Sequence, residues 1–497
     1  MEYREYFKKF NENDCEEVLT HITNEKAEGF LLENAPRLYC PEQTIEETFA
    51  FRTWTMRKHI KKTEVGYLIT EFLPNVAWAA KYNTINAPLT HHLNEFRWLK
   101  NANEFLDYIR FFIRGEGSAY FTKSAFAYQT PALTAMYNYC LLTANEEFLR
   151  KNAADFEKYF LTWEERHLTK NGLYWSIDDR EGTEFSISGT CGTVVTRKVL
   201  KGFRPLMNAC MAADARSLSK IFDMVGDKEK SAFYKEKSNF IKNKIDEKMW
   251  DGDFYKAVHP LEQDFDKEIS YLDIPIDNNA RELVGYIPFA FNLPNVGKEK
   301  CFAYLKDEKV FKAKTGLATA EISHERFMYS PEHGCTWNGK VWPYATSYVL
   351  NACIEVLNNY SQEIITNEDL YNLTKQYAQM HYSIENGKKI NFIDEVMMPY
   401  EYIWVVREQA RDGTKEFSGG KNRGRDYNHS TFLDVVLRGL CGVDTQTKEL
   451  TVEPKIKGIW KWFKIENLSF KGKTYNVYYD EDGSVFSKGK GVVIEKI

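Results

Sequence analysis

The segment RPLMNACMAADARSLSKIFDMVGDKEKSAFYKEKSNFIKNKIDEKMW, residues 204–250, contains two amphipathic patterns separated by a short polar turn. Apolar residues recur at steps of three and four on each side of the turn, which places them on one face of a helix. Two helices joined by a brief connection form a helical hairpin. Further helices of this kind are expected at 104–113, 124–142, 147–168, 339–360, 367–384 and 428–440. The pattern therefore predicts a mainly α fold in which about six hairpins close into a ring.

The sequence predicts three parts. Residues 86–442 form the helical barrel, and residues 443–497 alternate apolar and polar residues between Gly and Asp-Gly turns, which is typical of short antiparallel strands. Residues 1–85 are expected to be an N-terminal extension packed on the barrel, with strands at 29–40 and 65–74 and a helix at 47–62.

Charge and composition exclude several classes of partner. The 66 Lys and Arg residues are outnumbered by 71 Asp and Glu, and the net charge of −5 leaves no basic surplus for nucleic acid. No apolar run is long enough to span a membrane, and the charged N-terminus lacks the apolar stretch of a signal peptide. Nine cysteines are scattered singly, which suits free thiols in a reducing compartment. We expect a cytoplasmic protein without nucleic-acid or membrane partners; no oligomeric state is predicted.

Aromatic residues are abundant, at 15% of the chain, with 30 Tyr and 11 Trp. Aromatic faces stack on sugar rings and on bases, so the excess indicates a carbohydrate or nucleobase ligand; a Tyr-rich core with exposed phenols is an equally weighted alternative. The chain lacks the GxGxxG, P-loop, HExxH and GxSxG motifs, and its histidines are too dispersed for metal-ligand spacing. We therefore expect no metal and no cofactor.

Carboxylates beside aromatic residues are concentrated in long loops, at 171–203, 314–343 and 385–427. Two clusters stand out, LYWSIDDREGTE (173–184) and NFIDEVMMPYEYIW (391–404). Cleavage of a glycosidic bond needs one carboxylic acid to protonate the leaving oxygen and one carboxylate to activate water. In a ring of hairpins these loops can meet at one mouth, on opposite sides of a pocket.

Other loops supply candidate binding residues. HGCTWNGKVWPYATS (333–347) places two tryptophans and an amide around a glycine, which suits a sugar platform; the alternative is a Trp corner that caps the next helix. The segment NTINAPLTHHLNEFRWLK (83–100) contains a second set of candidate binding residues on consecutive helical turns. The alternative interpretation of these residues is an ion pair within the helix plus a Trp in the core. The candidate substrate-binding residues are Trp78, His92, Arg97, Trp98, Trp175, Glu184, Arg204, Asn208, Trp337, Asn338, Trp342, Tyr427 and His429.

Five segments in one order, RPLMNACMAADARSLSKI, ELVGYIPFAF, GLATAE, CTWNGKVWPYATS and RGRDYNHSTFLDVVLRGLCGV, carry a family resemblance. They resemble the mannosylglycerate-hydrolase-like glycosidases, a group similar to processing α-glucosidase I and more distantly to trehalase. The resemblance implies an (α/α)6 six-hairpin toroid and an inverting glycoside hydrolase that acts on a small carbohydrate, with an Asp acid and a Glu base.

The resemblance also assigns roles to residues. SIDDRE lies where the group has its acid and FIDEV where it has its base, so the resemblance implies Asp178 as the acid and Glu395 as the base. Asp179 and Glu184 are rival acids. Adjacent side chains of an extended stretch point to opposite sides, and the pattern alone leaves the choice open.

Two other functions fit the sequence less well. A sugar epimerase on an α-hairpin barrel transfers protons with facing histidines, whereas this chain offers carboxylates in its loops. A non-catalytic carbohydrate-binding protein would keep sugar binding without turnover. The leading expectation is an exo-acting hydrolase that removes a terminal sugar from a glycoside or oligosaccharide.

Overall fold

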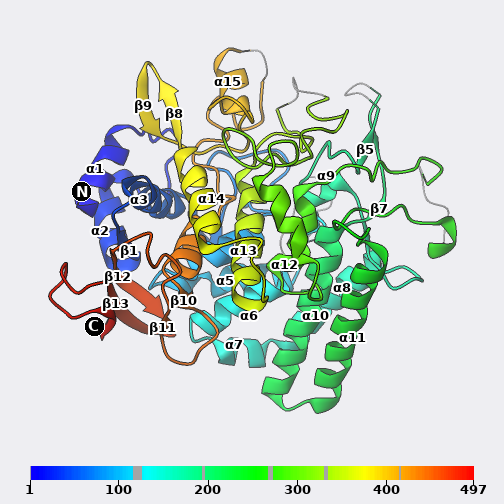
Figure 1. Cartoon of the computed structure of the whole chain (residues 1–497), viewed down its shortest axis with the longest axis horizontal. Helices are drawn as coiled ribbons and strands as arrows, with labels where there is room; N and C mark the ends of the chain where they lie inside the picture. The colour runs from blue at the N-terminus through cyan, green and yellow to red at the C-terminus, as the bar shows by residue number, and fades with distance from the viewer. Residues whose placement is uncertain (1, 116–125, 193–195, 267–271, 330–333, 414–415) are drawn as a thin grey trace.

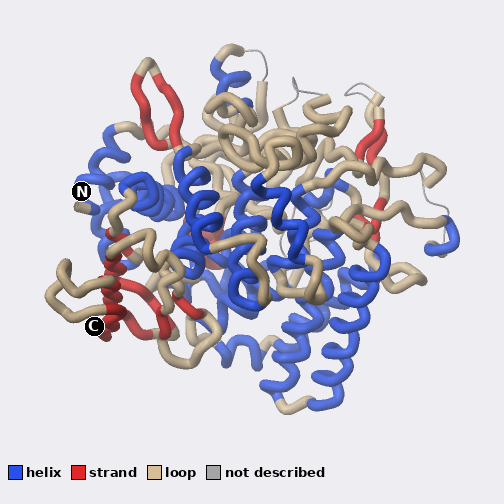
Figure 2. Tube along the Cα trace, viewed as in Figure 1, coloured by secondary structure: helices blue, strands red, loops and turns tan. Residues whose placement is uncertain are grey.

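The structure is a computed structural model that describes residues 2–115, 126–192, 196–266, 272–329, 334–413 and 416–497. Helices make up most of its regular structure, and loops crowd one end of the helical body, at the top of Figure 2. The predicted mainly α fold is confirmed.

The hairpin predicted from residues 204–250 is present as α10 (Pro205–Val225) and α11 (Lys228–Lys248), which pack along each other and meet at the bottom of Figure 1. Gly226 ends α10 with φ 83°, a left-handed conformation that glycine adopts without a Cβ clash. Asp227 then caps α11 by accepting a hydrogen bond from the Lys230 amide at 3.0 Å. Buried residues surround α10 but occupy one face of α11, so α10 lies inside the body and α11 covers it.

Six helical segments that are buried along most of their length form a closed circuit of contacts: α4 (Leu89–Phe96), α6 (Leu133–Leu142), α10, α12 (Ile287–Ala290), α13 (Pro343–Asn359) and α16 (Phe432–Asp434) with its continuation η5 (Val435–Leu440). Each contacts the next, α13 contacts η5, and α16 returns to α4. Residues far apart in sequence thus line one interior.

Other helices cover this circuit from outside: α3 (Gln43–Lys58), α5 (Leu106–Ile113), α7 (Glu146–Lys151), α8 (Ala153–His167), α11 and α14 (Asn367–Gln379). The α8 helix packs on α10, and α14 packs on α13 and α3. Thus α3, from the predicted N-terminal extension, packs on α14 and α16 of the helical body.

Two predicted helices differ from the observed ones. The helix expected at 147–168 divides at Asn152, whose side-chain amide donates to the Phe148 carbonyl at 2.8 Å and ends α7. The helix expected at 124–142 begins only at Leu133, because Pro131 disfavours helical backbone before it; residues 124 and 125 lie outside the described part of the chain.

A four-stranded antiparallel sheet with the order β1-β12-β13-β14 joins the two ends of the chain. Its strands are β1 (Arg37–Tyr39), β12 (Trp462–Phe470), β13 (Lys473–Asp480) and β14 (Gly491–Lys496). The predicted C-terminal sheet is confirmed. The strand expected at 29–40 is mostly wrong, because α2 (Asn24–Asn34) precedes β1, and α1 (Tyr3–Glu12) packs beside it.

The remaining elements are short. Two-stranded pairs are β2 (Ile60–Thr63) with β3 (Gly66–Ile69), β4 (Trp175–Ser176) with β7 (Gly202–Phe203), β5 (Thr190–Cys191) with β6 (Lys198–Val199), β8 (Tyr382–Glu385) with β9 (Lys388–Asn391), and β10 (Val443–Asp444) with β11 (Thr451–Val452). Short helices are η1 (Ala102–Phe105), α9 (Asp178–Glu181), η2 (Glu262–Asp264), η3 (Leu283–Tyr286), η4 (Glu299–Lys306) and α15 (Val405–Arg411). Among the described residues, no helix has the length and apolar character needed to cross a membrane.

Candidate active site

Asp178 begins α9 with its carboxylate enclosed by hydrogen bonds. One oxygen accepts from the Asp179 amide at 2.8 Å, and the other accepts from the Thr190 hydroxyl at 2.7 Å and from the amide and hydroxyl of Ser186 at 3.2 Å. The side chain has no exposed surface, and burial raises the pKa of Asp178 to about 6. Arg197 pairs with Asp179, whose side chain is 34% exposed. Asp178 is therefore fixed within the loop, while Asp179 faces outward to a guanidinium.

Glu184 follows α9 and is only partly covered, with few polar contacts of its own. The Cys335 thiol lies 3.5 Å from its Oε2 atom, and its backbone carbonyl accepts from the Trp337 amide at 2.9 Å. Burial, with the nearby charge of Asp179, raises the pKa of Glu184 to about 8. Glu184 is thus a carboxyl that holds a proton at neutral pH.

A buried ion pair holds this loop against α10. Arg204, directly before α10, donates from Nε to Glu181 at 2.8 Å, and Glu181 also accepts from the Ser176 hydroxyl at 2.6 Å. Arg204 also donates to Ser186 at 3.2 Å, beside the carboxylate of Asp178. Arg204 was predicted to bind substrate. Its hydrogen bonds to Glu181 and Ser186 instead hold the loop around α9 against the start of α10.

The second carboxylate cluster lies at Asp394 and Glu395. Glu395 is 5% exposed and pairs with Arg423, while its own amide donates to Asp394 at 2.6 Å. Burial raises the pKa of Glu395, and the Arg423 guanidinium opposes that rise. Burial also raises the pKa of Asp394 to about 7. Of the two, Glu395 forms the direct ion pair with Arg423, which favours its ionised form.

Glu71, which was not predicted as a site residue, belongs to the same cluster. Its Oε1 atom accepts from the Tyr427 hydroxyl at 3.3 Å and lies 3.0 Å from Nε2 of His429. Its Oε2 atom is buried and has no hydrogen-bond partner among the described residues. Burial raises the pKa of Glu71 to about 8. The sequence signal was an acidic residue inside the apolar stretch VGYLITEFLP (65–74).

Aromatic rings from 337–344 and 427–429 connect the two carboxylate clusters. Trp337 stacks on Trp342 with ring centroids 5.0 Å apart and meets Tyr344 edge-on at 5.5 Å, and Tyr344 lies 5.2 Å from His429. Among the described residues, the buried side-chain amide of Asn338 and the indole Nε1 of Trp337 have no hydrogen-bond partner. The rings of Trp337, Trp342, Tyr344 and His429 are called the aromatic floor below. Unpaired buried polar groups are rare in folded proteins, so the polar atoms of Trp337 and of the neighbouring Asn338 are available to a ligand.

The two clusters face one space. The negative charges of Glu184 and Glu395 both raise the pKa of the Cys335 thiol, and both also raise the pKa of the Tyr427 hydroxyl. Contacts agree with this: the Cys335 thiol lies 3.5 Å from Glu184, and the Phe72 ring contacts both Tyr427 and Arg423, the ion-pair partner of Glu395. Trp78 borders the same space, because the Arg423 guanidinium lies 5.5 Å from its ring centroid.

Several predicted binding residues lie outside this cluster. Both ring nitrogens of His92 are engaged, by Tyr108 and the Asn428 carbonyl, and Trp98 is a core residue that donates to Asp434 at 3.0 Å. The polar partners of the others are also inside the protein: Arg97 pairs with Asp434, the Asn208 amide bonds the Tyr174 backbone, and the Trp175 ring lies 4.9 Å from that of His167. The alternative of an ion pair and a core Trp describes this group, although the ion pair is not within one helix.

The structure also bears on metal binding. Among the described residues, no group of three His, Cys, Asp or Glu side chains is arranged to hold a metal ion. His333 falls outside the described residues.

A helical body with two clusters of carboxyls connected by aromatic side chains is typical of the glycosidase class of protein. The family model "Mannosylglycerate hydrolase MGH1-like glycoside hydrolase domain" matches residues 81–430, more than half of the chain. The chain belongs to this family, as the resemblance predicted.

Individual proteins also resemble the chain. A solved structure named "Sialidase" superposes with a TM-score of 0.86 at 29% identity, over 100% of this chain and 43% of that chain. The GH63 mannosylglycerate hydrolase from Thermus thermophilus, solved in complex with glucose, has a TM-score of 0.50 at 10% identity, over 78% of this chain and 98% of that chain, which shows a likeness of fold. An uncharacterized protein from Borreliella burgdorferi is 22% identical over 358 residues, 68% of this chain and 64% of that protein. The chain thus spans less than two thirds of the length of the sialidase and the Borreliella protein.

Proposed function

We propose that this protein is an inverting, exo-acting glycoside hydrolase that releases a terminal sugar from a small glycoside or oligosaccharide. One observation carries the proposal: the contacting rings of Trp337, Tyr344 and His429 connect the loop of Glu184 to Glu71, in the cluster of Glu395, although the two loops precede different helices of the circuit. An inverting reaction needs such a pair, one carboxyl on each side of the scissile bond with room for water.

Glu395 is the base in this proposal. Arg423 favours the ionised carboxylate, which can then remove a proton from an attacking water. Glu71 lies on the same side with one unpaired oxygen, which supports a role in binding a sugar hydroxyl.

The acid comes from the loop 178–184. A proton donor must reach the leaving oxygen, and the partly exposed, weakly bonded carboxyl of Glu184 supports this role for it. The hydrogen bonds around Asp178 support a role as the anion that fixes the loop. The resemblance favours Asp178 as the acid, so that assignment stays a prediction, and variants of the two residues separate the choices.

The closed circuit of buried helices, covered by outer helices, supports an (α/α)6 toroid with the site at one mouth. The domain limits 1–85, 86–442 and 443–497 remain part of this proposal.

The epimerase alternative depends on facing histidines, and His91 and His429 do stack with ring centroids 5.8 Å apart. Burial, however, lowers the pKa of both rings to about 3, and His91 Nε2 bonds the Tyr344 carbonyl at 3.1 Å. Two histidines that resist protonation do not serve as proton carriers at neutral pH. The hydrolase is therefore the better-supported function.

A panel of glycosides tests the proposal. The wild-type chain should release the terminal sugar of at least one member, and Glu395→Gln should abolish release while sugar binding stays measurable. Hydrolysis of equal rate in Glu395→Gln would overturn the assignment of the base. Sugar binding without turnover by the wild type would favour the non-catalytic alternative.

A further inference from the structure

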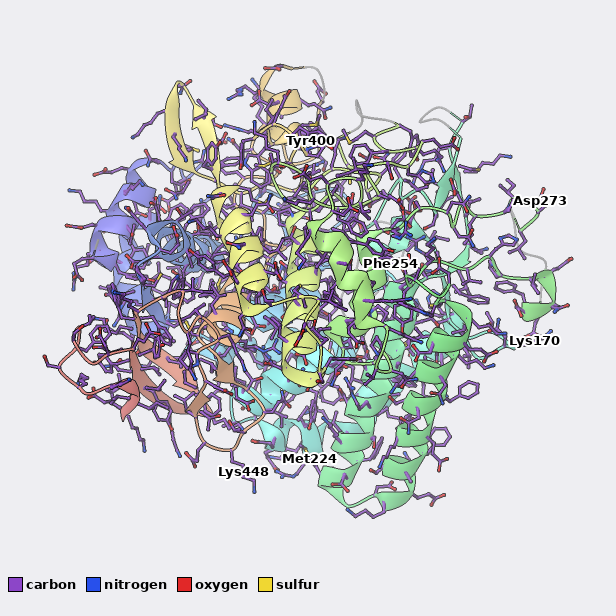
Figure 3. The ribbon with its side chains drawn as sticks, in the orientation of Figure 1. Lys170, Met224, Phe254, Asp273, Tyr400 and Lys448 are labelled. Carbon is purple, nitrogen blue, oxygen red and sulfur yellow. The ribbon has the colours of Figure 1, made fainter. Side chains whose placement is uncertain are left out.

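A separate cavity of about 730 Å³ lies toward the opposite end of the helical circuit. It is lined by residues of the later turns of α10 and α13, whereas the carboxylate site lies at the beginnings of these helices. Arg216, which lines it, is twelve residues beyond Arg204 along the chain, a rise of roughly 18 Å. In Figure 3, Met224 near the end of α10 and Lys448 of the β10–β11 loop mark that end, and Tyr400 marks the loop end.

A wall of rings separates the cavity from the carboxylate site. His91 and Tyr348 line the cavity, and both pack on Tyr344, with centroids 4.3 Å and 5.3 Å away. The other contacts of Tyr344 are the floor residues Trp337 and His429. The cavity is therefore not an extension of the acid and base pocket.

Five cations line the cavity, Arg97, Arg216, Lys220, Arg438 and Lys455, against three carboxylates, Glu355, Asp444 and Glu453. Arg97 and Arg438 are neutralised there by Asp434, and Arg438 also pairs with Glu355. Neither Arg216 nor Lys220 of α10 has a carboxylate partner within the described part of the chain.

Arg216 instead donates to the Phe291 carbonyl at 2.6 Å, and Lys220 Nζ lies 5.5 Å from the Tyr137 ring centroid. Arg216 is partly buried, and Lys220 lies about one helical turn further along α10. Cations one helical turn apart repel each other, so an anion bound between them would offset that repulsion.

Uncharged hydrogen-bonding groups share the lining. The side-chain amides of Asn94, Asn138 and Asn358 line the cavity and make no hydrogen bond with the described residues. Each amide can both donate and accept, which matches the hydroxyl groups of a sugar. The volume is that of a small-molecule site.

We propose that this cavity is a second ligand site that binds a small anionic carbohydrate, a sugar carrying a phosphate or a carboxylate group. Arg216 and Lys220 hold the anionic group, and the three asparagine amides hold hydroxyl groups. Nothing in the proposed hydrolysis uses these residues, so the site is distinct from the catalytic one.

Isothermal titration calorimetry on the full chain at low ionic strength tests the proposal with four probes: D-glucose 6-phosphate, D-gluconate, D-glucose and inorganic phosphate. At least one sugar anion should bind about tenfold or more tightly than both glucose and inorganic phosphate, because both the charge and the hydroxyls contribute. The two sugar anions distinguish a phosphate from a carboxylate preference. Equal affinity of all four probes, or binding of none, would overturn the proposal.

Variants locate the binding. Arg216→Gln should weaken the sugar anion by about tenfold or more, Lys220→Gln should weaken it by a smaller factor, and Arg216→Lys should keep part of the affinity. Lys220 is exposed, so its variant keeps the test valid if Arg216→Gln fails to fold. Lys228→Gln, an exposed change on the same hairpin, is the matched control and should bind as the wild type does.

Glu395→Gln distinguishes the two sites and should leave this binding unchanged. Loss of binding in Glu395→Gln together with unchanged binding in Arg216→Gln would place the ligand in the carboxylate site and overturn the proposal. If Glu395→Gln loses hydrolysis but still binds the sugar anion, the result supports two separate sites.

Discussion

The backbone amide of Trp337 donates a hydrogen bond to the backbone carbonyl of Glu184 at 2.9 Å. This bond ties the loop after α9 to the loop before α13, two segments that are far apart in sequence. It sets the position of the Glu184 carboxyl relative to the aromatic floor, while the side chain of Glu184 keeps its freedom to reach a substrate. Catalysis requires such positioning, because small misplacements of a catalytic group lower the rate strongly.

Substrates whose leaving groups differ in their need for a proton show which residue is the acid. Glu184→Gln should lower kcat on an alkyl glycoside by about 10²–10⁴-fold and much less on an aryl glycoside whose leaving group needs no proton. Asp178→Asn should lower both rates by similar factors, because it disturbs the loop rather than the proton transfer. Steady-state kinetics with both substrates measure this. The reverse pattern, with leaving-group dependence in Asp178→Asn alone, would assign the acid to Asp178.

The pH profile of kcat/KM should be bell-shaped. Glu184 must hold its proton, so activity should fall as the pH rises through its pKa of about 8. Glu395 must be ionised, so activity should fall as the pH drops through its pKa, which burial raises above the ordinary value. Glu184→Gln should abolish the basic limb and keep the acidic one. A basic limb that persists unchanged in this variant would contradict the role of Glu184.

Arg423 should tune the acidic limb. Its guanidinium favours the ionised form of Glu395, so Arg423→Gln should raise the pKa of Glu395 further and move the acidic limb to higher pH. Arg407→Gln is a suitable control, because Arg407 pairs with Glu385 rather than with Glu395. An acidic limb that stays in place in Arg423→Gln would show that another group titrates there.

Glu71 should act as a neutral carboxylic acid. Because burial raises the pKa of Glu71 to about 8, Glu71→Gln resembles the form present at pH 6 and should change kcat/KM there by less than about fivefold. Glu71→Ala removes the hydrogen bonds to Tyr427 and to the ligand and should cost about 10–100-fold. Equal losses in the two variants would indicate that the charged form is required.

Asp434 should be important for stability rather than for catalysis. It accepts from Arg97 Nε at 3.1 Å, from Trp98 Nε1 at 3.0 Å and from Arg438. Asp434→Asn leaves buried cations without their counter-charge and should lower the free energy of unfolding by about 3–5 kcal/mol. Chemical denaturation measures this; a loss below about 1 kcal/mol would mean that the cations find other partners or leave the core.

Sequence reasoning captured those parts of the fold that local patterns determine. The hairpin of α10 and α11 follows from apolar periodicity and from Gly226 and Asp227 at the turn, and the strands β12 to β14 follow from alternation. The pairing of β1 with β12 could not be predicted in this way, because it joins residues more than 400 positions apart through backbone bonds that carry no sequence signal.

The site was anticipated in part. Both carboxylate clusters and the aromatic segment were predicted from the sequence, and contacts of Cys335 and of the rings of Trp337, Tyr344 and His429 link these segments. His92 on α4, and Arg97 and Trp98 directly after it, were expected in the same site, but their polar atoms meet partners elsewhere in the interior. Glu71 was missed because its partners, Tyr427 and His429, come from the other end of the chain.

The anomeric form of the first product tests the central claim most directly. A proton NMR time course, started with a hydrolysed glycoside of known anomeric configuration, shows the configuration of the released sugar before it equilibrates. If Glu184 protonates the leaving oxygen and Glu395 activates a water on the other side of the bond, the released sugar has the inverted configuration. Initial release of the retained anomer would contradict it, because retention requires a covalent intermediate on one of the carboxylates.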